Sequence, residues 1–478
     1  MSINSLLETG RTALNAQKLA LEVTGENITN VNTTGYSRQT TILETAPTTL
    51  ERGFPLGSGV KVAAVQRSYD GFLQTQIMGQ NATYGQGKTS NSALQRVQQL
   101  FNEFTTDGLG VSLQNFFKSW QDLTVNPQGA PERQAVLSQG QQLVDNFHRI
   151  NSNLNDVKSD MNKSLEGQVS DINDTLNQIA TLNLQIKQIE VQSGPANEMR
   201  DKRDLLLRQL SQKVGISFVE QPDGMVDVSL TSGQSLVVGK DAAALSLLPN
   251  AANSGFYDIL LTPPGGGPAV NATAFIGGPG NTQGEIGGAL LVRDTMVNNY
   301  LSELDELAST LASEVNGLHS AGYGLTAAST GLDFFTPPAA VAGYSGQGGI
   351  GVNIAAISDV AAADADPTVN GTGNNKNAQS IASVYDKFLA MSAGNVTLEG
   401  FYDSLVGKVG VGVQNAGRAE SQSDGILKQL NNMRESASGV SLDEELANLI
   451  KYQKAYEGAA KLINVGSEML DTVINLVK

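Results

Sequence analysis

Hydrophobic residues recur in alternating steps of four and three positions at both ends of this 478-residue chain. Such a repeat limits each end to a helix that packs against another helix. Both stripes also contain small or polar members, which makes them only moderately apolar and is typical of a helix that becomes ordered on meeting its partner. The apolar members are Ile3, Leu7, Leu14, Leu21 and Ile28 near the start, and Leu442, Leu446, Leu449, Tyr456, Ile463, Leu470 and Ile474 near the end.

The last helix has a recognisable start. Ser441 is followed three residues later by Glu444, which is the spacing of a capping box that satisfies two free backbone N–H groups. No stop signal follows, so the helix is predicted to continue to Lys478.

The middle of the chain repeats the helical pattern. Pro131 suits the first turn of a helix, and the apolar register then holds from Leu143 to Ile189, until Ser193-Gly194-Pro195 ends it. A helix of about 60 residues would be roughly 90 Å long. Further helices are predicted over 196–214, 286–318 and 398–433. Together these segments predict a long, narrow helical bundle.

Two segments interrupt the helical pattern with short runs typical of strands. In 216–284, Pro222-Asp223-Gly224 separates two alternating runs, which predicts a hairpin. Strands are also predicted over 256–261 and 273–276, and a Gly- and Ala-rich stretch at 321–375 contains another over 351–354. The predicted fold is α+β but predominantly α: an elongated, heptad-patterned helical bundle formed by both chain ends and the middle, with inserted β-rich lobes.

Composition excludes several classes of protein. The chain has no cysteine, so it has no disulfide framework, no Cys-ligated metal site and no thiol nucleophile. Its net charge of −16 argues against a nucleic-acid or anionic-membrane surface. No apolar run is long enough to span a bilayer. With two histidines and no catalytic motif, nothing points to an enzyme, a metal or a cofactor.

One run after the first helix is distinctive, because its Asn-rich sequence ends the helix and its glycine permits a turn with positive φ. This run, 27–38, resembles the N-terminal signature of the bacterial flagellar axial proteins, which comprise rod, hook and hook-associated proteins. The segments 442–450, 452–456 and 468–471 resemble the C-terminal helix of the same family. Within the family, the chain is most similar to proteins of the hook–filament junction. The signature residues are Asn27, Asn30, Asn32, Thr33, Gly35, Tyr36 and Arg38.

The resemblance and the pattern together divide the chain into seven segments. The first axial helix with its signature loop covers 1–40 and pairs with the axial coiled-coil helix of 437–478. A helical bundle domain with an extended entry segment covers 41–215. The remaining segments are a β-rich lobe (216–284), a bundle helix (285–320), a Gly- and Ala-rich β lobe (321–376) and further bundle helices (377–436).

The resemblance implies a structural adaptor at the hook–filament junction that is needed for filament assembly and motility. Such a protein would be exported by the flagellar type III apparatus and would be extracellular after a transient cytoplasmic stage. The implied partners are further copies of itself in a ring, the hook protein, the second junction protein (hook-associated protein 3) and a cytoplasmic export chaperone on the C-terminal helix. The two terminal stripes would then form the assembly interface.

Three alternatives remain open at this stage. Another axial protein, such as a hook or distal-rod subunit, would share the terminal motifs, although the long interior helix argues against a hook subunit. A secreted hydrolase would have to rely on carboxylate, Lys, Tyr and Ser side chains. An adhesin would use the β lobes to bind a surface.

Overall fold

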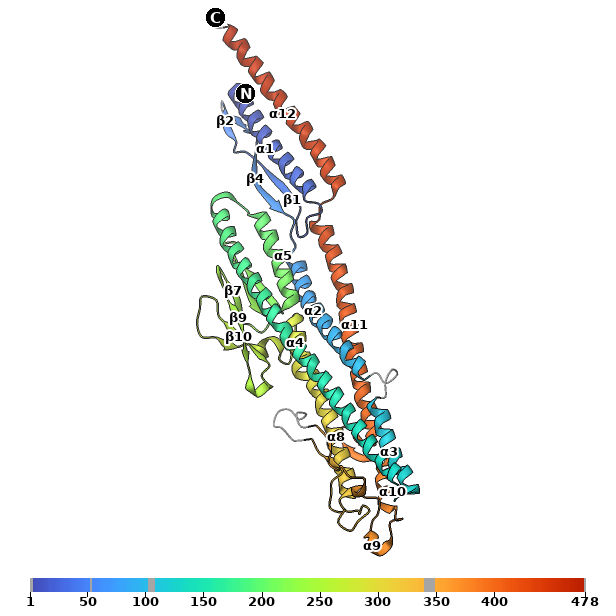
Figure 1. The fold of residues 1–478 in the computed structure, drawn as a ribbon. Helices are drawn as coiled ribbons and strands as arrows, with labels where there is room; N and C mark the ends of the chain where they lie inside the picture. Colours follow the sequence, from blue (N-terminus) through green and yellow to red (C-terminus); the bar gives the residue numbers. More distant parts are fainter. Residues whose placement is uncertain (1–2, 52–53, 102–107, 339–348, 477–478) are drawn as a thin grey trace.

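The computed structural model describes residues 3–51, 54–101, 108–338 and 349–476, and it shows an elongated molecule with both chain ends at one extremity (Figure 1). Helices dominate the described residues, in which the strands form small sheets of two to four. The predicted fold class is confirmed. For brevity, we call the part that holds both chain ends the terminal unit and the rest the body.

The terminal unit contains two helices and a β-ribbon. Helix α1 spans Ile3–Thr29 and α12 spans Leu442–Leu476. Strands β1 (Gln39–Thr45) and β4 (Val60–Arg67) form an antiparallel pair that packs against α1, and β2 (Thr49–Glu51) pairs with β3 (Phe54–Leu56) at the far end of the ribbon. The sequence predicts a bundle domain with an extended entry segment over 41–215; in the structure, the β1–β4 pair within the first part of that range packs against α1.

The body is built around α4 (Ala130–Ser193), a single helix of 64 residues. The long interior helix is therefore confirmed, and Pro131 lies in its first turn as predicted. The helices around it are α2 (Gly71–Leu100), α3 (Leu109–Val125), α5 (Asn197–Lys213), α7 (Gly284–Leu291), α8 (Val297–His319) and α11 (Leu398–Ser438).

Among the described residues, the two larger hydrophobic cores lie along the body. One surrounds Trp120, Phe116 and Phe334 and fills the half that is farther from the terminal unit. The other lies between α4, α5 and the β lobe. Helices α7 and α8 are joined without a break by a π-helical turn, η2 (Val292–Met296), where the predicted single helix over 286–318 changes its winding.

The lobe over 216–277 contains two small sheets. Strands β5 (Ile216–Glu220), β6 (Val226–Leu230), β7 (Ser235–Val238) and β8 (Asp241–Ala242) form one, and β9 (Ala244–Pro249), β10 (Tyr257–Thr262) and β11 (Val270–Asn271) form the other. The hairpin at 222–224 and the strand at 256–261 are confirmed. The strand predicted at 273–276 is wrong: Thr273–Gly277 is a short helix, α6, because the Asn271 side chain accepts from the Thr273 N–H and starts a turn.

The second insertion contains less β structure than predicted. In the described part of 321–376, β12 (Phe335–Thr336) and β13 (Gly351–Val352) are two residues each, so the strand predicted over 351–354 stops early. The short helix α9 (Pro367–Asn370) and irregular chain form much of the remainder, and α10 (Lys376–Ala382) and the hairpin of β14 (Leu389–Met391) and β15 (Gly394–Val396) follow. Gly and Ala supply few of the branched or aromatic side chains that stabilise strands.

Candidate assembly interface

Helices α1 and α12 lie side by side and run antiparallel (Figure 1). Glycines set their spacing. A Cβ on Gly10 would lie 2.8 Å from Ile463 Cγ1, and a Cβ on Gly466 would lie 2.7 Å from Leu7 Cδ2. Because neither glycine has a side chain, the two backbones can approach closely at these points.

The face of α12 that packs against α1 follows a heptad pattern. Glu445, Ala459 and Gly466 are buried, and Leu449, Tyr452, Tyr456 and Ile463 lie half-buried between them. The predicted stripe shares three residues with this face: Leu449, Tyr456 and Ile463. The sequence pattern missed Glu445, Ala459 and Gly466 because glutamate, alanine and glycine contribute little to a hydrophobic pattern, and it also missed Tyr452.

The remaining predicted residues of α12 are exposed in the single chain: Leu442, Leu446, Leu470 and Ile474. On α1, the predicted residues Ile3, Leu7, Leu14, Leu21 and Ile28 are all half-buried. Their role in an assembly interface stays a prediction. We define a second stripe on α12, the outer stripe, whose members are all exposed: Leu462, Val465, Met469, Val473 and Leu476.

Asn27, at the end of α1, is the centre of a buried hydrogen-bonded cluster and is only 1% exposed. Its Nδ2 donates to the Gln39 carbonyl at 2.8 Å and to Glu445 Oε2 at 3.0 Å. Its Oδ1 accepts from the Gln39 N–H and from the Tyr36 hydroxyl, both at 2.9 Å. One asparagine therefore ties α1 to the ribbon and to α12.

Arg38 extends this cluster to the first turn of α12. Its Nε donates to Glu445 Oε1 and its Nη1 to Glu444 Oε2, both at 2.8 Å. Glu445 is only 2% exposed, so it depends on Arg38 and Asn27 to compensate for the burial of its charge. Glu444, assigned from sequence to a capping box, accepts the second of these bonds, and the capping box itself stays a prediction. We call Asn27, Tyr36, Arg38, Gln39 and Glu445 the signature cluster.

The rest of the signature shapes the loop after α1. Asn30 donates to the Glu26 carbonyl, Thr33 donates to Asn30 Oδ1, and Asn32 is exposed. Gly35 has a φ of 87°, which favours glycine. Burial, with a further contribution from Glu26, raises the pKa of Tyr36 well above its usual range, so its hydroxyl stays protonated and can donate to Asn27.

A second cluster of polar residues joins the terminal unit to the body. Asp201 on α5 accepts from the Ser37 N–H at 2.8 Å and from Arg67 Nη1 at 2.8 Å. The same Nη1 donates to Asp204 at 2.6 Å. Burial raises the pKa of Asp204, and the positive charge of Arg67 opposes that rise. No sequence signal marked these residues, because Arg67 is separated from the two aspartates by more than 130 positions.

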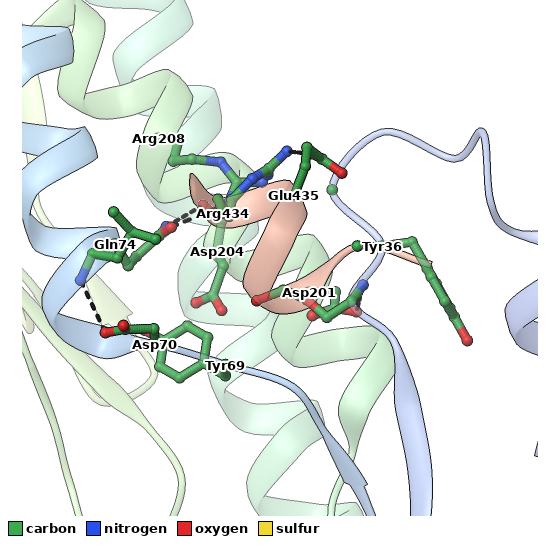
Figure 2. A pocket seen from close by; sticks show the side chains of 14 residues that line it. Tyr36, Tyr69, Asp70, Gln74, Asp201, Asp204, Arg208, Arg434 and Glu435 are labelled. Atoms are coloured by element: carbon green, nitrogen blue, oxygen red, sulfur yellow. Dashed lines mark hydrogen bonds and ion pairs between the residues drawn. The ribbon is translucent and has the colours of Figure 1, made fainter. Parts of the chain in front are cut away.

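A hollow lies beside this joint, and Figure 2 shows the side chains that line it. Arg208 Nη1 donates to Gln74 Oε1 at 3.1 Å. Burial lowers the pKa of Arg208 to about 10, and the neighbouring Arg434 adds like-charge repulsion. Among the described residues, no group of three or more His, Asp or Glu could hold a metal ion. The hydrogen bond between Arg208 and Gln74 joins α5 to α2.

Comparison with known proteins identifies the family. Over 98% of its length the chain is 31% identical to flagellar hook-associated protein 1 of Bacillus subtilis (strain 168), 97% of which is covered. The chain belongs to the flagellar hook-associated protein 1 family. Its relative in Escherichia coli (strain K12) is 26% identical over 99% of this chain and 100% of that protein. That alignment spans 570 positions, so parts of the E. coli protein have no counterpart among the 478 residues here.

Family profiles match three parts of the present chain. Residues 94–335 match the "Flagellar hook-associated protein FlgK helical domain". Residues 7–36 match "Flagella basal body rod protein", and residues 434–476 match "Flagellar basal body rod FlgEFG protein C-terminal". The last two matches cover α1 with most of the signature loop, and α12. The resemblance inferred from sequence is therefore confirmed, and the chain is a structural protein of the flagellum.

A solved structure also supports the fold of the hook-associated protein 1 family. The flagellar hook junction protein FlgK from Burkholderia pseudomallei superposes with a TM-score of 0.67 at 16% identity. The match covers 76% of this chain and all of that one. None of the described helices is long and apolar enough to cross a membrane.

Proposed function

We propose that this protein is the adaptor of the hook–filament junction and that it works by packing its terminal helices against those of neighbouring subunits. The observation that carries the proposal is the distribution of apolar residues on α12. One face packs against α1, whereas Leu442, Leu446, Leu470, Ile474 and the outer stripe are exposed in the single chain. Exposed apolar residues along one helix are typical of an interface that forms on assembly.

The proposed assembly is a ring of copies between the hook protein and the second junction protein, hook-associated protein 3. Ile3, Leu7, Leu14, Leu21 and Ile28 of α1 line the interface together with the predicted residues of α12. Many of these side chains retain exposed surface that a neighbouring helix would bury, and each fully buried Leu or Ile side chain contributes about 1.5–3 kcal/mol.

The same exposed helix explains two further proposals. A cytoplasmic chaperone covers α12 before export, because an apolar helix face invites aggregation. The flagellar type III apparatus then exports the chain to the extracellular flagellum, and a chain without cysteine can pass between compartments without disulfide chemistry. The protein acts through contacts and not through catalysis.

Immunogold electron microscopy of purified flagella tests the location. Antibody raised against the 216–277 lobe should label one band between hook and filament, and flagella from a strain that lacks the gene serve as the control. Label along the hook or on the rod would assign the chain to another axial position. Flagella without label would overturn the proposal.

A further inference from the structure

A groove runs between α4 and α5 on the part of the body next to the terminal unit. Three half-buried leucines, Leu182, Leu205 and Leu206, form its apolar part. Lys202 lies exposed at its edge and forms no ion pair with any described residue. We call these four residues, together with Asn177, Gln178 and Thr181, the α4–α5 groove.

The groove continues toward the signature loop. Lys202 and Leu205 also line a second hollow, together with Glu198 and Asp201 of the same helix. The signature loop borders this hollow on its other side, through Asn30 and the residues from Thr33 to Tyr36. A Cβ on Gly35 would lie 3.4 Å from Leu205 Cβ, so the loop sits directly against this end of the groove. The hollow surface is therefore continuous from the helices of the body to the joint with the terminal unit.

The end of α12 has the complementary chemistry. Gly466 is the last buried residue of α12, and the helix continues from there to Leu476 without a buried residue. This end of α12 projects beyond α1 (Figure 1). In this part of the outer stripe, Met469, Val473 and Leu476 are all exposed. Glu468 lies along one side of them and, like Lys202, forms no ion pair with a described residue. We call 467–476 the α12 tip.

We propose that the α4–α5 groove of one copy receives the α12 tip of a second copy. The apolar residues of the tip pack on Leu182, Leu205 and Leu206, and Glu468 approaches Lys202. This inference rests on the proposed function, because it names the site on the body that one of the assembling helices contacts. Lys202 of the groove and Glu468 of the tip carry opposite charges, and both surfaces are otherwise apolar, so the two are complementary.

The contact has to form between copies. Within one chain, Glu445 lies at the joint, in contact with Arg38. Met469 is 24 residues farther along a helix that rises about 1.5 Å per residue, so it lies about 36 Å away from that end of the helix. Helix α12 leads away from the body, which places the tip beyond reach of its own groove (Figure 1). A tip-to-groove contact joins two different surfaces, and such contacts build rings or helical arrays.

Cysteine cross-linking tests the contact in assembled flagella, because the natural chain contains no cysteine. Lys202→Cys and Met469→Cys are introduced together, and purified flagella are treated with a short bis-maleimide. The expected result is a covalent multimer of this chain, at least several-fold more abundant than in a control pair of Lys202→Cys with Asp471→Cys. Asp471 points to the opposite side of α12, because two residues turn a helix by about 200°. Equal yields from the two pairs would overturn the proposal.

A charge exchange provides an independent readout. Lys202→Glu should lower incorporation into flagella by several-fold, and adding Glu468→Lys to the same chain should restore it. Lack of restoration would contradict the pairing. Immunogold labelling of the same flagella separates the two levels of inference: label at the junction without the selective cross-link overturns only the groove, whereas absence of label from unsubstituted flagella overturns the proposed function.

Discussion

Replacing Asn27 with alanine should lower the free energy that stabilises the packing of α1, the ribbon and α12 in the terminal unit. Asn27 forms four hydrogen bonds, of which three have neutral partners and one has the carboxylate of Glu445. A neutral bond contributes about 1 kcal/mol and a bond to a charged group about 2 kcal/mol, which gives a sum of about 5 kcal/mol. A water molecule that enters the space left by the side chain can replace some of these bonds, so we expect a net loss of about 3 kcal/mol.

Native-state hydrogen exchange of the full chain measures this loss at one defined amide. The Arg38 N–H donates to the Ser438 carbonyl at 2.8 Å, between the ribbon and the end of α11. A loss of about 3 kcal/mol should accelerate its exchange roughly a hundredfold in Asn27→Ala. Amides in the middle of α4 should keep their rates, because that helix belongs to the body.

Asn32→Ala is the matched control. Asn32 belongs to the same signature but is exposed, so its replacement should change the exchange of the Arg38 amide by less than about twofold. The reasoning would be refuted if Asn27→Ala and Asn32→Ala behaved alike. It would equally be refuted if the Arg38 amide of the unsubstituted chain exchanged as fast as that of an unfolded peptide.

Three further predictions concern other parts of the molecule. Leu470→Asp should abolish incorporation into flagella, because Leu470 is 37% exposed in the single chain and a charge is costly to bury on assembly. The circular dichroism spectrum should stay unchanged. Asn464→Asp is the control, and normal incorporation of Leu470→Asp would show that Leu470 is not part of the interface. Gly10→Val should weaken α1–α12 packing by about 1–3 kcal/mol in exchange measurements, because the valine side chain would collide with Ile463. At Gly458 an added Cβ meets open space, so Gly458→Ala should be neutral or stabilising. A larger loss from Gly458→Ala than from Gly10→Val would contradict the packing. Burial lowers the pKa of His319, whose Nδ1 donates to the Leu332 carbonyl while Nε2 accepts from the Ala361 N–H, so the unfolded chain binds the proton more readily. The free energy of unfolding should therefore fall as pH drops below about 6.5, by up to about 1.4 kcal/mol per pH unit. His319→Gln should flatten this dependence, and an unchanged dependence in that variant would contradict the reasoning.

Sequence patterns predicted the elements of this protein better than their contacts. The long helix α4 follows from an apolar register that continues over many turns, and the hairpin at 222–224 follows from a local turn signal. Both signals lie within the segment that they shape. The helix at 273–277 was missed because a single asparagine side chain decided between a turn and a strand there.

The contacts of α12 could be predicted only in part. Its sequence contains the predicted stripe and, beside it, the outer stripe. Periodicity alone does not tell which side of the helix faces α1. The close approach at Gly10 and Gly466 decides the matter, and it depends on the absence of side chains. The contacts of Arg67 with Asp201 and Asp204 lay beyond sequence reasoning for another reason: the partners meet only after the whole chain has folded.

The π-helical turn at Val292–Met296 divides one continuous helix into two parts that pack in different hydrophobic cores. Before the turn, Ile286, Ala289 and Leu290 belong to the core shared with the lobe. After the turn, Val297, Leu301 and Leu304 belong to the core in the half of the body farther from the terminal unit. A π-helical turn holds one residue more than an α-helical turn, so the helix presents a differently directed face to each core. One continuous helix therefore contributes to both cores, through faces that differ in direction on the two sides of the turn.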